Sequence, residues 1–195
     1  KQRPDRLGEF TFLYAGKVNR DTGAAISQFL DACSSLNMQG YRIRLKIHSP
    51  YPLSELKPYL GDKSDEVYAG KLPYSELPNA FRNADALLLP LNFSKETIKY
   101  IRLSMLTKAT EYMISGTPIF VFAPGEVAVA EYLVSRNAAF HCGEPTQLEA
   151  AIKKFIEDPE LRRAIGASGK LCAEQHHTSQ IVGERLRSLL CEICR

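Results

Sequence analysis

Residues 104–122 read Ser-Met-Leu-Thr-Lys-Ala-Thr-Glu-Tyr-Met-Ile-Ser-Gly-Thr-Pro-Ile-Phe-Val-Phe. The first twelve predict a short helix, because Gly116 stands where a helix-ending residue is expected and Pro118 prevents continuation. The apolar run Ile119–Phe122 that follows predicts a buried strand. A helix followed directly by such a strand is typical of an α/β fold.

One side of this predicted helix is polar. Ser104 is expected to be its N-cap residue, with Thr107 in the first turn. Helical spacing places Ser104, Lys108, Glu111 and Ser115 on one side. In a first interpretation, the helix N-terminus and Lys108 hold an anion, and Glu111 accepts hydrogen bonds from sugar hydroxyls. In a second, Lys108 and Glu111 form an ordinary exposed ion pair three residues apart.

The rest of the chain alternates predicted strands and helices. Strands are expected at 10–15, 41–48, 66–69, 84–90, 119–122 and 138–142. Helices are expected at 24–36, 54–60, 74–82, 104–115, 126–134, 144–156, 158–177 and from 179 to the end, with a polar loop at 92–103. The sequence has no linker-like stretch, so it predicts one domain over residues 1–195. The expected fold is a doubly wound, mostly parallel, Rossmann-like sheet with helices on both faces.

Ligands of such sheets bind at the carboxyl ends of the strands. After the first strand, Gly16, Lys17 and Arg20 form a basic segment, which indicates either a phosphate-facing turn or a plain strand–helix turn. The chain has neither a G-x-G-x-x-G nor a Walker A motif, which removes the strongest support for NAD or a P-loop. His48 and His141 also end strands, and we expect both to be structural.

The composition is that of an ordinary globular protein, with 45% hydrophobic and 24% charged residues. The net charge of +3 is spread along the chain, so no nucleic-acid partner is expected. No apolar run is long enough for a membrane span, and the polar start without Met suggests a fragment of a longer protein. An odd number of cysteines, five, predicts reduced thiols. Cys191 and Cys194 lack a second pair, so no zinc site is expected.

Five segments, in order, resemble motifs of the C-terminal, donor-binding domain of GT-B glycosyltransferases, within the large retaining group 1 (family 4-like). The box S-x-x-T-K-x-x-E-Y-M-x-x-G-x-P at 104–118 is the longest of them. The others are the strand and "G-R-L" turn at 13–18, the strand and helix start at 67–78, the A-D-A-L-L-L-P strand at 84–90 and the D-P-E-L-R helix start at 158–162. Together they extend over nearly the whole chain.

The resemblance implies roles for the matching positions. Glu111 is expected to bind the ribose of a nucleotide sugar, and Lys71 and Leu72 to lie near its base. The donor diphosphate is expected against Gly16, Lys17, Arg20, Ser104, Thr107 and Lys108. Fixed cations and helix N–H groups stabilise a departing diphosphate without a metal or another cofactor. No catalytic residue is assigned.

For the whole protein, the resemblance implies transfer of a hexose from a nucleotide diphosphate sugar, such as a UDP-sugar, to a glycan or lipid-linked acceptor, with retention. This requires the protein's own N-terminal domain, so the fragment alone is expected to be inactive. The implied setting is bacterial polysaccharide assembly in the cytoplasm, at the inner membrane surface through the missing half.

Two positions depart from the family pattern. Leu103 replaces the first glutamate of Glu-x7-Glu, which contacts the donor sugar, and Thr22 replaces the lysine that usually precedes Gly23. The base, the sugar and the acceptor therefore stay open. A non-catalytic nucleotide or sugar-phosphate binding module is the main alternative. A nucleotide-sugar epimerase is a further one, with His48 and His141 as its candidate residues.

Overall fold

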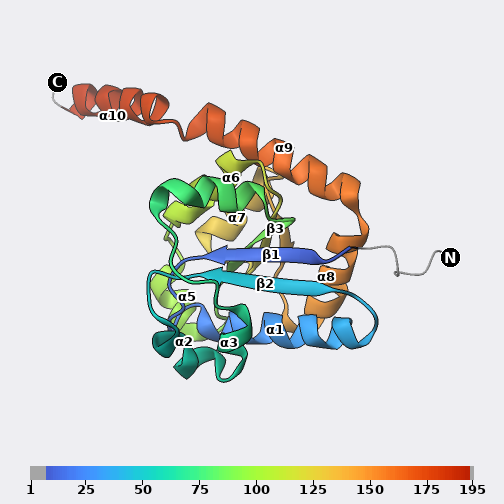
Figure 1. Cartoon of the computed structure of the whole chain (residues 1–195). Helices are drawn as coiled ribbons and strands as arrows, with labels where there is room; N and C mark the ends of the chain where they lie inside the picture. The colour runs from blue at the N-terminus through green and yellow to red at the C-terminus, as the bar shows by residue number, and fades with distance from the viewer. Residues whose placement is uncertain (1–7, 194–195) are drawn as a thin grey trace.

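A sheet of five parallel strands forms the centre of the structure, a computed structural model that describes residues 8–193. The strands are β1 (Phe10–Ala15), β2 (Ile43–His48), β3 (Ala86–Pro90), β4 (Ile119–Phe122) and β5 (Phe140–Cys142). Their order is β2-β1-β3-β4-β5, and every neighbouring pair is parallel (Figure 1). From β1 the chain adds β2 on one side of the sheet, and it then crosses over to add β3, β4 and β5 on the other side. The position between β1 and β3 is therefore a topological switch point. The doubly wound parallel sheet is confirmed.

Helices cover both faces of this sheet, as the sequence predicts (Figure 1). They are α1 (Gly23–Met38), α2 (Leu53–Leu60), α3 (Lys63–Val67), α4 (Leu77–Arg82), α5 (Lys95–Ile101), α6 (Thr107–Ser115), α7 (Ala128–Ser135), α8 (Leu148–Glu157), α9 (Pro159–His176) and α10 (Ser179–Ile193). Two short 3-10 turns, η2 (Tyr74–Glu76) and η3 (Pro145–Gln147), precede α4 and α8. One core joins the sheet to α1, α2 and α8, and a second joins it to α4, α6, α7 and α9.

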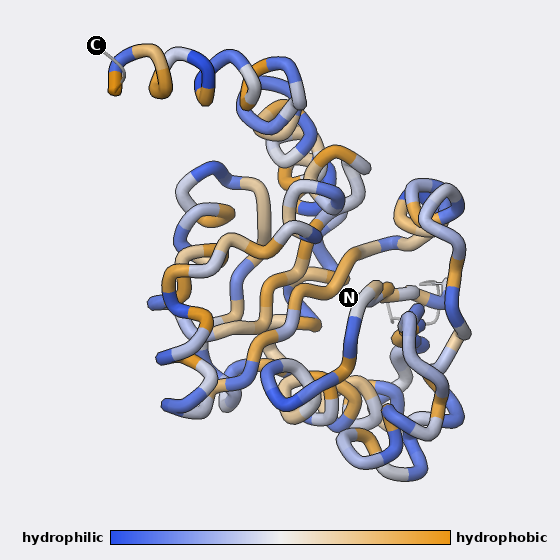
Figure 2. The backbone as a smooth tube through the Cα atoms, turned by 90° about the vertical axis from the view of Figure 1, so that its left-hand side faces the viewer, coloured by the Kyte–Doolittle hydropathy of each residue, from blue (hydrophilic) through white to orange (hydrophobic). Residues whose placement is uncertain are grey.

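The two cores follow from the alternation of side chains along each central strand. On the α1 side, the Phe12 ring lies 5.0 Å from Phe29, 5.9 Å from Phe120 and 6.1 Å from Phe155, measured between ring centroids. On the other side, Leu13 packs in the core of α6 and α9. β3 and β4 are therefore apolar throughout, and β1 is apolar except for Thr11. The hydrophobic segments of the sheet are orange in the middle of Figure 2.

β2 differs from the central strands because only one of its faces is covered. Its residues alternate between buried and exposed, with Arg44 and Lys46 exposed. This confirms the half-covered strand that its alternating sequence predicts. β2 is an end strand of the five-stranded sheet. On its outer side, Ile47 forms a single isolated parallel bridge with Tyr68.

Two predicted segments are wrong. The strand expected at 66–69 is reduced to that single bridge, because α3 continues to Val67 and leaves only Tyr68 extended. The loop expected at 92–103 contains α5. Ser94 caps this helix by accepting a hydrogen bond from the Thr97 amide at 3.2 Å, and Thr97 and Ile101, four residues apart, are buried.

The helix that carries the polar stripe begins three residues later than expected. Ser104 is not its N-cap; α6 starts at Thr107, after an extended Leu106. Leu106 packs against the second core, and this anchor holds residues 102–106 in a turn between α5 and α6. The predicted end is confirmed, because Gly116 has the left-handed conformation (φ 75°) of a helix-ending glycine.

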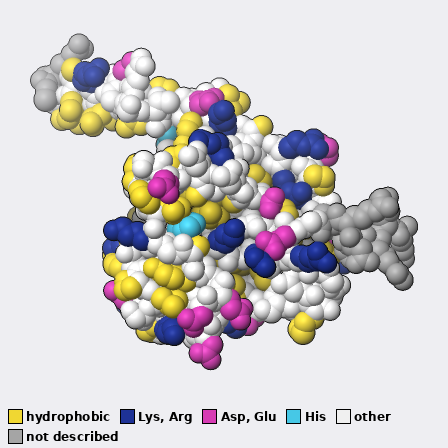
Figure 3. All heavy atoms as spheres, viewed as in Figure 1, with side chains coloured by type: hydrophobic (Ala, Val, Ile, Leu, Met, Phe, Trp, Pro, Cys, Tyr) yellow, Lys and Arg dark blue, Asp and Glu magenta, His cyan; other side chains and the backbone are white. Residues whose placement is uncertain are grey.

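At the other end of the chain, α10 extends away from the body of the protein (Figure 1). Its apolar side chains gather along one side, as Figure 3 shows, and none of its residues is buried. Within residues 8–193, no helix has both the length and the apolar character that a membrane crossing requires. Cys33, Cys142 and Cys172 are buried free thiols, Cys191 is exposed, and Cys194 lies outside the described residues.

Candidate nucleotide-sugar site

Two tyrosines join the carboxyl end of β1 to α6. The buried Tyr112 hydroxyl accepts a hydrogen bond from the Ala15 amide at 2.9 Å. The Tyr14 hydroxyl donates to the Lys17 carbonyl at 2.6 Å. The first bond fixes the end of β1 against the middle of α6, and the second holds the loop that follows β1. Burial raises the pKa of Tyr112, so its hydroxyl stays neutral and available for this bond.

A cavity of about 430 Å³ lies at this switch point. It is lined by the end of β1 and its loop, the end of β3, and α5 and α6. The predicted site residues along its wall are Gly16, Lys17, Ser104, Thr107, Lys108 and Glu111. Arg20 is exposed and does not line the cavity, whereas its neighbours Asp21 and Thr22 do.

Lys108 reaches from α6 to the end of β1. Its Nζ lies 3.0 Å from the Tyr14 hydroxyl and 4.2 Å from the centre of the Tyr14 ring. Gly16 makes room for it, because a Cβ atom at that position would lie 2.4 Å from the Lys108 Nζ. The glycine of the first motif thus permits a cation to stand beside the β1 loop.

Lys17 supplies a second cation on the same loop. Its side chain is exposed, and Nζ lies 5.2 Å from the centre of the Tyr51 ring. Interaction with the Tyr51 hydroxyl raises the pKa of Lys17, so the ammonium stays charged at neutral pH.

The loop between β1 and α1 is held by residues whose role the sequence does not reveal. Thr22 donates from Oγ1 to the Lys17 carbonyl at 3.2 Å, so the residue that replaces the family lysine closes the loop on itself. Asn92, which follows β3 and is buried, accepts from the Ala25 amide at 2.7 Å and donates to the Arg20 carbonyl. A polar residue directly after a buried strand is the signal that identifies Asn92.

The first turn of α6 faces the same cavity through Thr107 and Lys108. Backbone N–H groups of a first helical turn have no partner inside the helix, and the helix dipole favours negative charge there. Two lysines and a helix N-terminus around one cavity form an environment suited to an anion such as a diphosphate.

Glu111 lies one turn further along α6, where two cavities meet. It lines the cavity at the switch point and a second, apolar one of about 320 Å³ between α4 and α6. Its Oε1 accepts a hydrogen bond from the Tyr74 hydroxyl at 3.0 Å. Within residues 8–193, Lys108 and Glu111 do not form the ion pair that the second interpretation predicts, because each contacts a tyrosine instead. Lys71 and Leu72 line neither cavity, although they lie just before Tyr74 in the chain.

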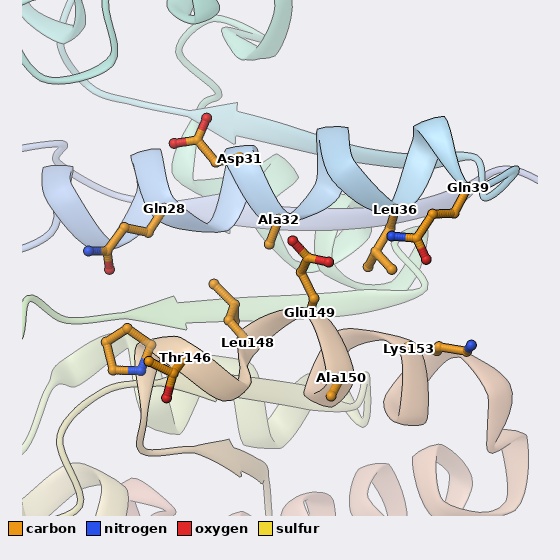
Figure 4. A pocket seen from close by; sticks show the side chains of 11 residues that line it. Gln28, Asp31, Ala32, Leu36, Gln39, Thr146, Leu148, Glu149, Ala150 and Lys153 are labelled. Atoms are coloured by element: carbon orange, nitrogen blue, oxygen red, sulfur yellow. The ribbon is translucent and has the colours of Figure 1, made fainter.

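A larger hollow, of about 700 Å³, lies between α1 and α8 (Figure 4). Its wall consists of one side of α1, the η3 turn and the first turns of α8, with Gln28, Asp31, Glu149 and Lys153 among the residues that line it. These lining residues include no residue of a strand, and the first turn of α8 carries the Glu149 carboxylate rather than a cation. This hollow is therefore less suited to an anion than the cavity at the switch point.

His48, which ends β2, and His141, which lies in the middle of β5 rather than at its end, both contact backbone carbonyls, as expected of structural residues. The Nδ1 atom of His48 lies 3.1 Å from the Gly70 carbonyl, and the Nε2 atom of His141 lies 2.8 Å from the Ala123 carbonyl. Within the described part of the chain, no three His, Cys, Asp or Glu side chains converge as metal ligands do.

Solved structures share this fold at low sequence identity. A sucrose-phosphate synthase from Thermosynechococcus elongatus is 16% identical, with a TM-score of 0.72 over 95% of this chain and 45% of that one. The C-terminal domain of a group 1 family glycosyl transferase (LpcC) from Francisella tularensis is 16% identical, with a TM-score of 0.63 over 88% of each chain. Anabaena Alr3699/HepE, solved in complex with UDP-glucose, is 16% identical, with a TM-score of 0.69 over 94% of this chain and 49% of that one.

The chain thus spans about half the length of several of the full-length proteins whose structures it matches. The likeness to the LpcC domain extends over most of both chains, so this chain has the fold of that C-terminal domain. No curated protein sequence matches the chain. A family described as "Glycosyl transferase-like" matches residues 22–188, which include α1, the strands β2 to β5 and α6. Of the β1–α1 loop, the match includes only Thr22, so Gly16 and Lys17 lie before it. The chain belongs to this glycosyl transferase-like family.

Proposed function

We propose that this chain is the donor-binding domain of a glycosyltransferase that moves a hexose from a nucleotide diphosphate sugar to a glycan or lipid-linked acceptor. The observation that carries the proposal is the joint placement of Lys17, Lys108, the α6 N-terminus and Glu111 around one cavity at the switch point. Anion-binding groups and a carboxylate acceptor in one cavity match the two polar parts of a nucleotide, its diphosphate and its ribose.

The spacing along α6 supports this match. Thr107 and Glu111 are four residues apart, about 6 Å along a helix axis. A ligand that lies along α6 can therefore place one group at the positively polarised N-terminus of the helix, near Thr107, and another at the Glu111 carboxylate one turn further on. In this arrangement Gly16, Lys17, Ser104, Thr107 and Lys108 surround the diphosphate. Arg20 is exposed on the same loop and reaches the ligand only by extending toward the cavity mouth.

The proposed chemistry uses these groups on the leaving diphosphate. As the bond from the sugar to the phosphate oxygen breaks, negative charge grows on the diphosphate, and fixed cations and N–H groups stabilise that charge. The transfer is proposed to retain the sugar's configuration and to need neither a metal nor another cofactor. The base is proposed to lie beyond Glu111, toward Lys71, Leu72 and Tyr74.

The rest of the proposal concerns the whole protein. The acceptor site and the remaining catalytic contacts are assigned to an N-terminal domain, so this chain alone binds nucleotide without transferring sugar. UDP is the first nucleotide to test, since Alr3699/HepE binds UDP-glucose with the same fold. The proposed setting is bacterial polysaccharide assembly in the cytoplasm, with any contact to the inner membrane surface made by the other half.

The test is nucleotide binding to this chain. A thermal-shift screen of UDP, GDP, ADP and their sugars identifies the ligand, because a ligand that binds the folded state raises the melting temperature. Calorimetry then compares wild type with Glu111→Ala, for which we expect at least about a tenfold loss of affinity, since hydrogen bonds to a charged group contribute about 1.5–3 kcal/mol. Glu149→Ala, a helix carboxylate beside the larger hollow, is the matched control and should bind normally. Equal affinity of Glu111→Ala and wild type would exclude the site.

A non-catalytic binding module is the second candidate, and one observation favours it. Leu103, at the position of the family's sugar-contacting glutamate, is 87% exposed and offers a donor sugar no hydrogen bond. Activity of the full-length protein against a panel of nucleotide sugars separates the two candidates. Binding without transfer for every donor would support the module.

A further inference from the structure

The Glu111 carboxylate has a hydrogen-bond partner within the protein. The Tyr74 hydroxyl donates to its Oε1 at 3.0 Å, and within residues 8–193 this is the only hydrogen bond or ion pair that the carboxylate makes. The two residues come from separate elements, since Tyr74 begins η2 and Glu111 lies in α6. A neutral donor from another part of the chain thus holds the group proposed to bind ribose.

Tyr74 also stands where a nucleotide must extend. It lines the apolar cavity between α4 and α6, together with Leu77, Pro78 and Phe81. Glu111 borders both this cavity and the one that contains the two lysines. A ligand that has its diphosphate beside the lysines and its ribose at Glu111 continues toward the cavity that Tyr74 lines.

The phenol and the ribose offer the carboxylate the same kind of bond. Each presents an O–H donor, and a carboxylate accepts through both oxygens. The hydrogen bond to Glu111 raises the pKa of Tyr74, so the bond is made by a neutral phenol at ordinary pH. The Tyr74 side chain is 75% exposed, so it loses little packing when it moves.

Resting on the proposed function, we propose that Tyr74 is a gate on the ribose site. Its hydroxyl occupies the Glu111 carboxylate in the free protein, and the ribose hydroxyls of the nucleotide displace it. The nucleotide therefore binds at the cost of one existing hydrogen bond. When the nucleotide leaves, the Tyr74 hydroxyl takes its place on the carboxylate, which weakens the hold on a nucleoside diphosphate product.

The test compares a ribonucleotide with an analogue that lacks both ribose hydroxyls. Calorimetry measures UDP and 2′,3′-dideoxy-UDP on wild type, Tyr74→Phe, Glu111→Ala and the double variant. Without the phenol hydroxyl, we expect UDP to bind about two- to tenfold tighter, the range of one ordinary hydrogen bond. The affinity for dideoxy-UDP should stay unchanged, because that ligand does not displace the gate. In the Glu111→Ala background, Tyr74→Phe should leave the affinity for UDP unchanged, because the carboxylate that the phenol contacts is absent.

Tyr59→Phe is the matched control, because Tyr59 is a partly exposed tyrosine on α2 that lines neither cavity. Circular dichroism verifies that each variant is folded. If Tyr74→Phe binds UDP equally or more weakly while Glu111→Ala still loses affinity, the gate is wrong and the ribose site stands. If UDP does not bind, or if Glu111→Ala keeps the wild-type ratio of UDP to dideoxy-UDP affinity, the ribose site itself is wrong and the gate fails with it.

Discussion

At the amino edge of the sheet, polar side chains bond to other parts of the fold, whereas at the carboxyl edge the charged side chain of Lys17 is exposed beside the candidate cavity. Before β2, the Tyr41 hydroxyl donates to Glu157 at 2.5 Å, and before β3, Asp85 accepts from the Thr11 amide at 2.8 Å. After β1, in contrast, Lys17 is exposed, and its Nζ lies 5.2 Å from the centre of the Tyr51 ring. The amino edge stabilises the fold, and the carboxyl edge keeps charges available.

Arg162 is the clearest example at the amino edge. It donates to the Phe155 carbonyl at 2.6 Å and the Ile156 carbonyl at 2.5 Å, at the end of α8. Its guanidinium lies 5.1 Å from the centre of the Phe10 ring. These are carbonyls that the helix itself leaves unpaired, and Arg162 satisfies them. Mutations of Lys17 and Lys108 should therefore change nucleotide affinity, whereas mutations of Arg162 should change the stability of the fold.

The largest expected effect is at the carboxyl edge. Replacing Lys17 and Lys108 together by alanine should weaken UDP binding about 100-fold, since each charged hydrogen bond lost contributes roughly tenfold or more. The melting temperature should change little, because Lys17 is exposed and Lys108 is only partly buried. Calorimetry and thermal unfolding measure the two quantities. The control is the double variant Lys46→Ala with Lys153→Ala, which changes the net charge by the same amount at positions away from the cavity. If both double variants weaken UDP binding equally, the effect is due to the overall charge and not to the site.

The next effect is at the amino edge and should leave nucleotide binding intact. Arg162→Met keeps an apolar stem beside Phe10 but removes both donors to the α8 carbonyls. We expect a loss of about 1–3 kcal/mol in the free energy of unfolding, the cost of leaving such groups unpaired. Urea denaturation measures it. Arg163→Met, at an exposed neighbour whose ion pair with Glu160 is on the surface, should cost much less. A strong loss of UDP affinity in Arg162→Met would show that the two edges are coupled.

A smaller effect is expected at Gly16. A Cβ atom there would displace the Lys108 ammonium from the end of β1, since the two would lie 2.4 Å apart. The lysine side chain is flexible, so we expect Gly16→Ala to weaken UDP binding about three- to tenfold, or about 1 kcal/mol. Calorimetry measures it. Gly40→Ala is the control, because Gly40 also has a positive φ (100°) and an added Cβ there meets nothing within 4 Å. Unchanged affinity would mean that Lys108 is not required in its present position.

The smallest effect concerns pH. Burial, and then the Glu157 carboxylate, raises the pKa of Tyr41 to about 12 in the folded protein, from an ordinary value near 10. The unfolded chain therefore loses this proton first as pH rises, so the contribution of Tyr41 is complete below pH 10 and is lost between about pH 10 and 12. Urea denaturation between pH 8 and 11 should give a steeper decline for wild type than for Tyr41→Phe. Parallel declines would exclude Tyr41 as the cause.

Local patterns in the sequence are enough to predict most of the fold. The Gly116 and Pro118 signal ends α6 where expected, and the apolar run at 119–122 is β4. The failures lie where tertiary packing overrides local preference. Ser104 is a good capping residue, but the packing of the partly buried Leu106 against the second core shifts the helix start to Thr107. A polar composition hides α5, which is stabilised by the Ser94 cap and by two buried residues one turn apart.

The sequence predicts only those residues of the candidate site that belong to local motifs. Gly16, Lys17, Lys108 and Glu111 belong to motifs that the sequence displays, and the sheet edge brings them together. Tyr14, Tyr112, Asn92 and Tyr74 belong to no such motif. Their roles depend on contacts between segments from 37 to 97 residues apart, or on the path of a loop, and no local spacing encodes these.

The sequence by itself determines the alternation of strands and helices, the parallel sheet and the family, because periodicity and ordered motifs are local properties of the chain. Only the tertiary structure decides which partners these charged side chains have. Lys108 and Glu111 are three residues apart and suited to an ion pair, yet each is held by a tyrosine from a distant segment. Packing at the switch point therefore keeps a cation and a carboxylate apart, each facing a cavity, although their spacing alone favours a pair.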